Sequence, residues 1–144
     1  MRGPGYPIGE ASRATGVKVP TIRYYEDIGL ISAPSRSAGN RRLYDTDDLR
    51  RLAFIRHARE LGFDVEAIRT LLALQDRPSQ SCAAADAVAK ARLAEVDARI
   101  VRLTALKAEL EEMVAQCARG RIDTCRVIET LADGGHVHGR LAEV

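Results

Sequence analysis

The sequence has 144 residues, of which 46% are hydrophobic, 29% are charged and 4% are aromatic, with no Trp. A chain of this length accommodates one ordinary domain, or a small domain and a long helix, and is too short for most multidomain enzymes. No apolar run is long enough to cross a membrane, and residues 1–6 lack the apolar core of a signal peptide. We therefore expect a cytoplasmic protein with no membrane partner. In that compartment the three Cys are expected to be free thiols or metal ligands rather than a disulfide framework.

Positive charge is concentrated in the N-terminal part of the chain. The net charge is +2 at pH 7, but residues 13–42 contain six Lys and Arg and only two acidic residues. A local excess of this size suits a small module that binds the phosphates of a nucleic acid. A basic, solvated surface would have the same composition, so the charge alone leaves both interpretations open.

Two short helices are predicted near the N-terminus. The first covers residues 8–15 and ends at Gly16, and the second begins at Val19, where Pro20 lies in a first turn that needs no N–H from it. Two short helices joined by a few residues that include Gly are typical of a helix-turn-helix. Because apolar pairs flank the polar stretch 32–40, we expect a small β-hairpin, or wing, there.

Two further helices complete the predicted N-terminal domain. Asp45 or Thr46 can cap a helix that ends at Gly62, and Asp64 can cap another over residues 65–74. Apolar residues on the second of these helices form one face that can pack on the domain core.

Residues 82–117 contain neither Gly nor Pro and form a long predicted helix. Apolar residues recur there at every third or fourth position over about four heptads, with Lys107 as a polar interruption. The positions of this stripe are Ala89, Leu93, Val96, Ile100, Leu103, Lys107, Leu110, Val114 and Cys117. One helix cannot bury such a stripe alone, so a dimeric coiled coil is predicted; the alternative is a helix that folds back on its own domain.

The predicted fold class is mainly α. It consists of a winged helix-turn-helix domain at 1–76, a linker at 77–81, a dimerisation helix at 82–117, and a C-terminal loop, short helix and tail at 118–144.

The second predicted helix has two different faces. At about 100° per residue, Ile22 and Tyr25 lie on one side, while Arg23 and Tyr24 lie away from them. Tyr25 is therefore predicted to be a core residue. Exposed Tyr24 and Arg23 suit contact with phosphates or base edges in a major groove, and Thr21, near the helix N-terminus, is a further phosphate contact.

Several separated motifs carry a family resemblance. They are Ile8-Gly9-Glu10, Thr15-Gly16-Val17, Thr21-Ile22-Arg23-Tyr24-Tyr25-Glu26, Gly29-Leu30-Ile31, Arg36-Ser37-x-Gly39-Asn40-x-Arg42-x-Tyr44 and Leu61-Gly62-Phe63. In this order, over nearly the whole chain, they closely resemble the MerR family of bacterial transcription regulators. The resemblance implies a homodimer joined by an antiparallel coiled coil that binds promoter DNA with an overlong spacer. Effector binding would make the dimer bend and untwist that DNA, so that RNA polymerase engages both promoter elements.

The resemblance also implies which residues contact DNA. They are Thr21, Arg23 and Tyr24 on the recognition helix, Arg36, Arg42 and Tyr44 on the wing, and Arg59 on the helix before Gly62. Arg41 is an additional candidate on the wing. Many relatives have Tyr where Arg41 stands. His57, on the same helix as Arg59, is more simply a solvated or capping histidine.

The three cysteines have a spacing that fits a site shared between two chains. A helix rises about 1.5 Å per residue, so Cys82 and Cys117 of one chain would lie about 52 Å apart and cannot share an ion. Their separation of 35 residues is a whole number of heptads, which puts both on one seam. An antiparallel dimer brings Cys82 beside the partner's Cys117, whereas a parallel dimer keeps them apart. Gly120 can turn the chain so that Cys125 completes a three-thiolate site for a soft cation.

The resemblance implies a sensor of divalent soft metal ions. Metal-sensing members of the family have two Cys around a loop after the dimerisation helix, and sensors of divalent ions also have Cys at the position of Cys82, where copper-type sensors have Ser. The ligands would be Cys82 from the partner subunit, Cys117 and Cys125. Thiolate softness favours Hg(II), Cd(II) and Pb(II), while Zn(II) needs a fourth ligand. His136 or His138 in the tail can supply that ligand to Zn(II) or Cd(II) or form a separate weak site, and an unstructured tail without a metal is the alternative.

Other readings of the same residues stay open at this point. The seven-residue interval between Cys117 and Cys125 is shared with copper-type sensors, and a thiol-based sensor of oxidants or aldehydes would carry similar cysteines. Arg119 or Arg121 can offset the charge of a three-thiolate metal site or be ordinary solvated loop residues. An enzyme such as a zinc hydrolase is disfavoured, because three thiolates saturate a zinc ion and no carboxylate is placed as a general base.

Overall fold

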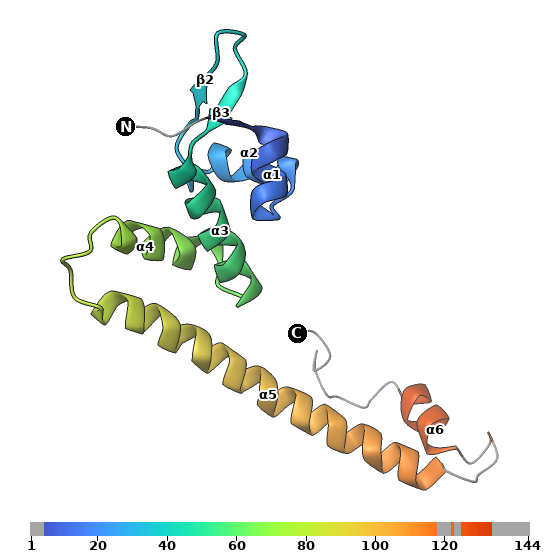
Figure 1. The fold of residues 1–144 in the computed structure, drawn as a ribbon. Coiled ribbons are helices and arrows are strands. Elements are labelled where there is room, and N and C mark those ends of the chain that lie inside the picture. The colour runs from blue at the N-terminus through green and yellow to red at the C-terminus, as the bar shows by residue number, and fades with distance from the viewer. Residues whose placement is uncertain (1–4, 118–121, 123–124, 134–144) are drawn as a thin grey trace. The chain divides into compact units, whose positions relative to one another are not determined.

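The computed structural model describes residues 5–117, 122 and 125–133, and most of these residues are helical (Figure 1). The elements in chain order are β1 (Tyr6–Pro7), α1 (Ile8–Thr15), α2 (Val19–Asp27), β2 (Ser35–Arg36), β3 (Arg42–Tyr44), α3 (Thr46–Glu60), α4 (Val65–Gln75), α5 (Ala83–Cys117) and α6 (Arg126–Ala132). The predicted mainly α fold class is confirmed.

The chain divides into two compact units, Met1–Ala89 and Lys90–Val144. The first turns of α5 belong to the first unit. Within this unit, a pocket of about 390 Å³ is lined by Cys82 and Ala85 together with Phe54 of α3 and Leu71 of α4.

Helices α1 and α2 form the predicted helix-turn-helix. Gly16 between them has a φ of 76°, in the left-handed region that favours glycine, and its N–H donates to the carbonyl of Ser12 at 2.8 Å. The buried Thr15 hydroxyl donates to the carbonyl of Ala11 at 2.8 Å and accepts the N–H of Val17 at 3.3 Å. These bonds fix the direction in which α2 leaves the turn.

A three-stranded antiparallel sheet forms the wing, with the strand order β1-β3-β2. The predicted hairpin between β2 and β3 is confirmed, and Ser35 pairs with Leu43 in its register. Strand β1 was not predicted from the sequence, because two residues that include a Pro carry no periodic signal. It pairs Tyr6 with Tyr44 and so ties the start of α1 to the wing.

Helices α3 and α4 begin at the predicted caps. The side chain of Asp45 accepts the N–H of Asp48, and the side chain of Asp48 accepts the N–H of Asp45, which makes a reciprocal capping box. Asp64 accepts the N–H of Ala67 at the start of α4. Gly62, with a φ of 85°, ends the turn between the two helices.

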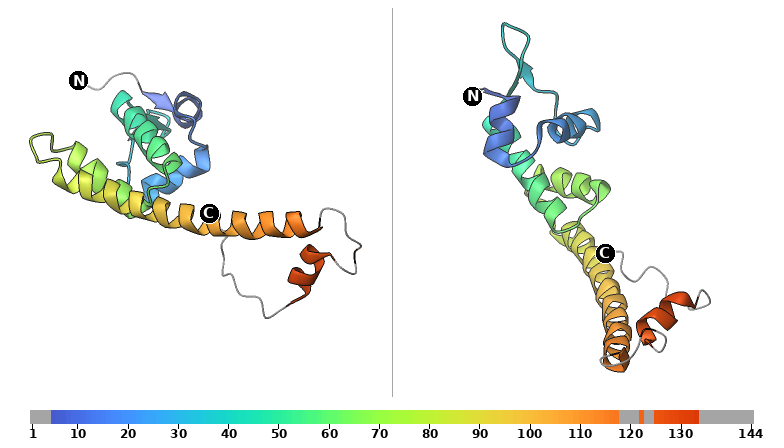
Figure 2. Two further views of the ribbon diagram at one scale, coloured as in Figure 1. Left: turned by 90° about the horizontal axis from the view of Figure 1, so that it is seen from below. Right: turned by 90° about the vertical axis from the view of Figure 1, so that its right-hand side faces the viewer.

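The core of the first unit lies between α1, α2, α3, α4 and the wing, and α1 packs along α3 (Figure 2). Its buried side chains are Ala11, Val17, Ile22, Tyr25, Leu30, Ile31, Tyr44, Leu52, Ile55, Ala58, Ile68 and Leu72. Two arginines hold the chain that leaves α2: Arg69 donates to the carbonyl of Ile28 at 2.9 Å, and Arg51 donates to that of Leu30 at 3.1 Å. The recognition helix is therefore fixed at its carboxyl end by α3 and α4.

Helix α5 is continuous from Ala83 to Cys117. Along it, apolar side chains of the predicted stripe are exposed in the described part of the chain: Leu93, Ile100, Leu103, Leu110 and Val114. The short C-terminal helix expected from the sequence is α6, which starts directly after Cys125. Among the described helices, none combines the length and the hydropathy that a bilayer span requires.

Candidate nucleic-acid interface and cysteine positions

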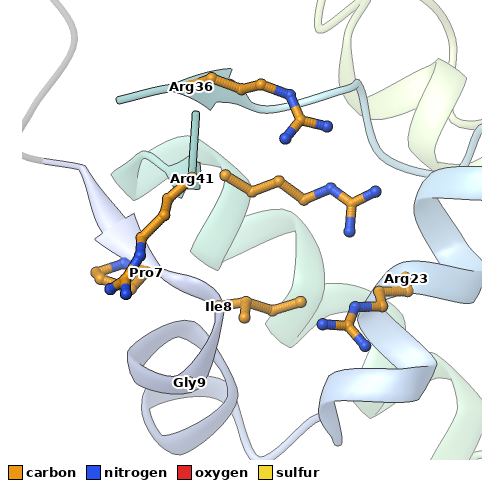
Figure 3. A pocket seen from close by; sticks show the side chains of 7 residues that line it. Pro7, Ile8, Gly9, Arg23, Arg36 and Arg41 are labelled. Carbon is orange, nitrogen blue, oxygen red and sulfur yellow. The ribbon is translucent and has the colours of Figure 1, made fainter. Parts of the chain in front are cut away.

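Four arginines surround one hollow between the recognition helix and the wing. It has a volume of about 570 Å³ and is lined by Arg23, Arg36, Arg41 and Arg42 together with Pro7, Ile8 and Gly9. Figure 3 shows the side chains of Arg23, from α2, and Arg36, from β2, on either side of this space. The structure thus brings together four arginines that are up to 19 positions apart in the sequence, in a concave site that suits an anionic phosphate.

The two faces predicted for α2 are confirmed. Ile22 and Tyr25 are 0% and 7% exposed, whereas Tyr24 is 52% exposed and Arg23 is also exposed. Thr21 is half-buried in the first turn of the helix. The tyrosine rings lie 5.9 Å apart, centroid to centroid, so the buried ring supports the exposed one.

The structure corrects the expectation for Tyr44. The sequence suggested a DNA contact from the wing, but Tyr44 is 0% exposed and its hydroxyl donates to Glu26 Oε2 at 3.2 Å. Burial of the phenol raises the pKa of Tyr44 to about 12, and the nearby negative charge of Glu26 is the second cause of this shift. The reason is strand alternation: Tyr44 shares a face of β3 with Arg42, and that face lies toward α2.

Glu26 is a residue that the sequence analysis did not assign to the interface. Its side chain is 12% exposed, and its Oε1 lies 3.4 Å from Nε of Arg42. The sequence carries two signals, its place at the end of the Thr21–Glu26 motif and its negative charge within a strongly basic stretch, and neither identifies a partner.

Of the other basic residues of the predicted interface, Arg36, Arg41 and Arg59 are exposed. In the wing turn, Arg36 donates to the carbonyl of Asn40 at 3.0 Å, and Asn40 has a left-handed φ of 62°. Arg59 closes the turn after α3 by donating to the carbonyl of Phe63 at 2.9 Å. His57 is exposed on α3 and lines a shallow apolar hollow that also contains Phe63.

Each cysteine lies at a helix boundary. Cys82 is exposed directly before α5, and its carbonyl accepts the N–H of Asp86 at 2.9 Å. Cys117 is the last residue of α5. Cys125 is half-buried at the N-cap of α6, where its carbonyl accepts the N–H of Glu129 at 2.9 Å.

The structure describes only part of the predicted metal loop. Residues 5–117, 122 and 125–133 of a single chain contain no group of three His, Cys, Asp or Glu side chains close enough to hold a metal ion. Arg119, Arg121, His136 and His138 lie outside the described residues.

Two family models match the chain. The model of the MerR HTH family regulatory proteins matches residues 6–75, and the model named MerR, DNA binding matches residues 49–113. Both describe DNA-binding regulatory proteins rather than enzymes. Together they span the recognition helix, the wing and most of α5.

Curated relatives match over most of their length. The HTH-type transcriptional regulator HmrR of Sinorhizobium medicae is 43% identical, over 89% of this chain and 87% of its own. The HTH-type transcriptional regulator ZntR of Escherichia coli K12 is 38% identical, over 90% and 94%. Heavy metal-dependent transcription regulator 2 of Rhizobium meliloti is 39% identical, over 88% and 86%.

Among solved structures, the transcription regulator PbrR691 from Ralstonia metallidurans CH34 in complex with lead(II) is 37% identical, with a TM-score of 0.74 over 88% of this chain and 98% of that chain. The MerR of Bacillus megaterium MB1 in complex with mercury(II) is 29% identical, with a TM-score of 0.68 over 89% and 100%. The fold, the family models and these identities agree, and the chain belongs to the MerR family of helix-turn-helix, DNA-binding regulators.

Proposed function

We propose that this protein is a metal-responsive transcription regulator that binds promoter DNA as an antiparallel homodimer. In this proposal, each of two equivalent sites holds a divalent soft metal ion through Cys82 of one subunit and Cys117 and Cys125 of the other. The observation that carries the proposal is the placement of Cys82 and Cys117 at the two ends of one continuous helix, α5.

The exposed apolar side chains of α5 support a partner helix on this element. Leu103, Leu110 and Val114 line an open groove of about 600 Å³ along the helix, and Leu110 and Val114 are 50% and 66% exposed. A second copy of α5 would remove this apolar area from water. If two copies of α5 pair in opposite directions about a twofold axis near Ile100, each Cys82 lies beside the partner's Cys117.

The chemistry of the donor set supports a soft divalent ion. Three thiolates suit Hg(II), Cd(II) and Pb(II), while Zn(II) would take His136 or His138 as a fourth ligand. PbrR691 and the Bacillus megaterium MerR were crystallised with lead(II) and mercury(II), and the Rhizobium meliloti relative is named as heavy metal-dependent. The exposure of Cys82 before α5 leaves its thiol accessible to a partner subunit.

The hollow between α2 and the wing supports binding to duplex DNA. Arg23, Arg36, Arg41 and Arg42 would neutralise backbone phosphates, and exposed Tyr24 would reach phosphate or base edges. Metal binding at the ends of α5 would then change how the two DNA-binding units of the dimer are held. The promoter spacer would be bent and untwisted, so that RNA polymerase engages both promoter elements.

A metal titration of the full-length protein tests the proposed effector. We expect Hg(II), Cd(II), Pb(II) or Zn(II) to stimulate transcription from the target promoter in vitro. Binding of the first three should also produce thiolate-to-metal charge-transfer absorption. Cys82→Ser should abolish the transcriptional response and leave metal-free DNA binding within about twofold, because Cys82 is exposed and is not among the residues proposed to contact DNA.

Ala84→Ser is the matched control for this variant, since it changes an exposed residue in the first turn of the same helix and should respond as the wild type does. Normal induction of Cys82→Ser would remove this residue from the site. Activation by peroxide or an aldehyde, with no response to any divalent ion, would favour a thiol-based sensor instead; a response confined to Cu(I) would favour a copper-type sensor.

A further inference from the structure

A partly buried carboxylate, that of Glu26, pairs with one of the four arginines that line the hollow. Glu26 is on the recognition helix α2, and its side chain is 12% exposed, against 31% for the neighbouring Arg42 on β3. Burying a carboxylate costs free energy unless charged or hydrogen-bonding partners compensate it. The partners of Glu26 therefore indicate what the residue does.

Both oxygens of Glu26 contact the same strand of the wing. Oε2 accepts the hydroxyl of Tyr44 at 3.2 Å, and Oε1 lies 3.4 Å from Nε of Arg42. That Nε is buried and has no hydrogen-bond partner among the described residues, so the carboxylate is the group that compensates its charge. One side chain thus connects the helix that carries Arg23 to the strand that carries Arg42.

We infer that Glu26 is a positioning residue for DNA binding, which holds Arg42 and the wing in register with the recognition helix. The inference rests on the proposed binding of promoter DNA. Glu26 need not touch the DNA. It fixes the spacing between Arg23, on α2, and Arg42, on β3, in a hollow where both guanidinium groups would meet phosphates.

The direction in which DNA affinity changes when Glu26 loses its charge distinguishes a positioning role from a purely electrostatic effect. DNA is polyanionic, so the removal of a negative charge beside its binding site should raise affinity if only the field mattered. If Glu26 positions Arg42, the same removal should lower affinity, because the arginine loses the group that orients it.

The test compares Glu26→Gln with Asp27→Asn, which removes one negative charge from an exposed neighbour on the same helix. Affinities are measured by fluorescence anisotropy over a series of salt concentrations. The DNA is a duplex selected from random sequences by the wild-type protein. Glu26→Gln should bind about tenfold more weakly, and Asp27→Asn should bind as tightly as the wild type or more tightly. Unchanged or tighter binding of Glu26→Gln would overturn the inference.

A double-mutant cycle with Arg42→Ala distinguishes positioning from a general loss of structure. In the Arg42→Ala background, Glu26→Gln should change affinity by less than about twofold, because the arginine that Glu26 orients is gone and the Gln amide oxygen can still accept the Tyr44 hydroxyl. A tenfold loss in both backgrounds would mean that Glu26 supports the fold and would overturn the inference. If Glu26→Gln does not fold, Glu26→Asp provides the test. The shorter side chain keeps the negative charge but cannot reach both Arg42 and Tyr44, so DNA binding should still be weaker than in the wild type. Wild-type affinity of Glu26→Asp would contradict the inference.

The same experiment distinguishes a failure of the proposed DNA binding from a failure of the positioning role of Glu26. If wild-type protein selects no duplex at all, DNA binding itself fails, before any variant is compared. If the wild type binds and only the Glu26 variants behave unexpectedly, the regulator assignment stands and the positioning role is wrong.

Discussion

Tyr44 shows how a single residue joins the wing to the recognition helix. Its ring is part of the core, and its hydroxyl reaches Glu26 on α2. Motif comparison associates this tyrosine with the DNA surface, but its burial gives it a different task. It supports the residues that do face the hollow, among them Arg42 on the same strand.

The raised pKa of Tyr44 predicts how stability depends on pH. The phenol has a pKa of about 12 in the folded protein against 10.0 for the ordinary group. The folded state therefore keeps this proton more tightly than the unfolded state. The resulting stabilisation is complete below pH 10 and is lost as the pH rises toward 12.

Tyr44→Phe should remove this part of the pH dependence. We expect the variant to lose about 1 kcal/mol of unfolding free energy at pH 7, since Glu26 loses a partly buried hydrogen bond. Between pH 10 and 12, its free energy of unfolding should fall less steeply than that of the wild type. Urea denaturation at a series of pH values measures both quantities, and parallel curves for the two proteins over this range would contradict the assigned pKa.

At the scale of elements, the residues proposed to contact DNA and the residues proposed to bind metal lie in different parts of the chain. Helix α2 carries Arg23 and Tyr24 on its exposed face, and α5 is bracketed by cysteines. Because no residue is shared between these two sets, damage to one element should leave the direct chemistry of the other intact.

Arg23→Ala tests this separation. It should weaken promoter binding by about tenfold and reduce the salt dependence of binding by about one phosphate contact, while the metal titration of the free protein is unchanged. Pro20→Ala, an exposed change on the same helix, is a control for general damage to α2. An equal loss of metal affinity in Arg23→Ala would show that the two functions are not separable.

The sequence predicts most elements because their signals are local. The caps at Asp45 and Asp64 and the glycines at helix ends place α3 and α4 closely, and the absence of Gly and Pro marks out α5. The burial of Tyr44 was beyond such signals, since it depends on which face of β3 packs against α2. The contact between Glu26 and Tyr44 joins residues 18 positions apart, and no periodic pattern specifies that pairing.

At the scale of the whole molecule, the proposed metal site requires a second copy of the chain. Leu93, Ile100, Leu110 and Val114 of α5 are each at least half exposed in the described part of one chain. The cysteines at the two ends of this helix are too far apart along it for one ion. The proposed antiparallel homodimer would account for both features at once, since it would bury the apolar stripe and bring opposite helix ends together. The same arrangement would place two metal sites at a distance from two DNA-binding units.

Mixed dimers of two complementary variants test this central claim most directly. One chain carries Cys82→Ser, the other carries both Cys117→Ser and Cys125→Ser, and distinct affinity tags allow the heterodimer to be purified. If each site takes Cys82 from the partner, the heterodimer has one intact three-thiolate site although neither homodimer has any. Titration with Hg(II) or Cd(II), followed by charge-transfer absorption, should therefore show one such site per heterodimer and none in either variant homodimer. The absence of a three-thiolate site from the heterodimer, with two present in the wild-type dimer, would contradict the shared site and the antiparallel arrangement that produces it.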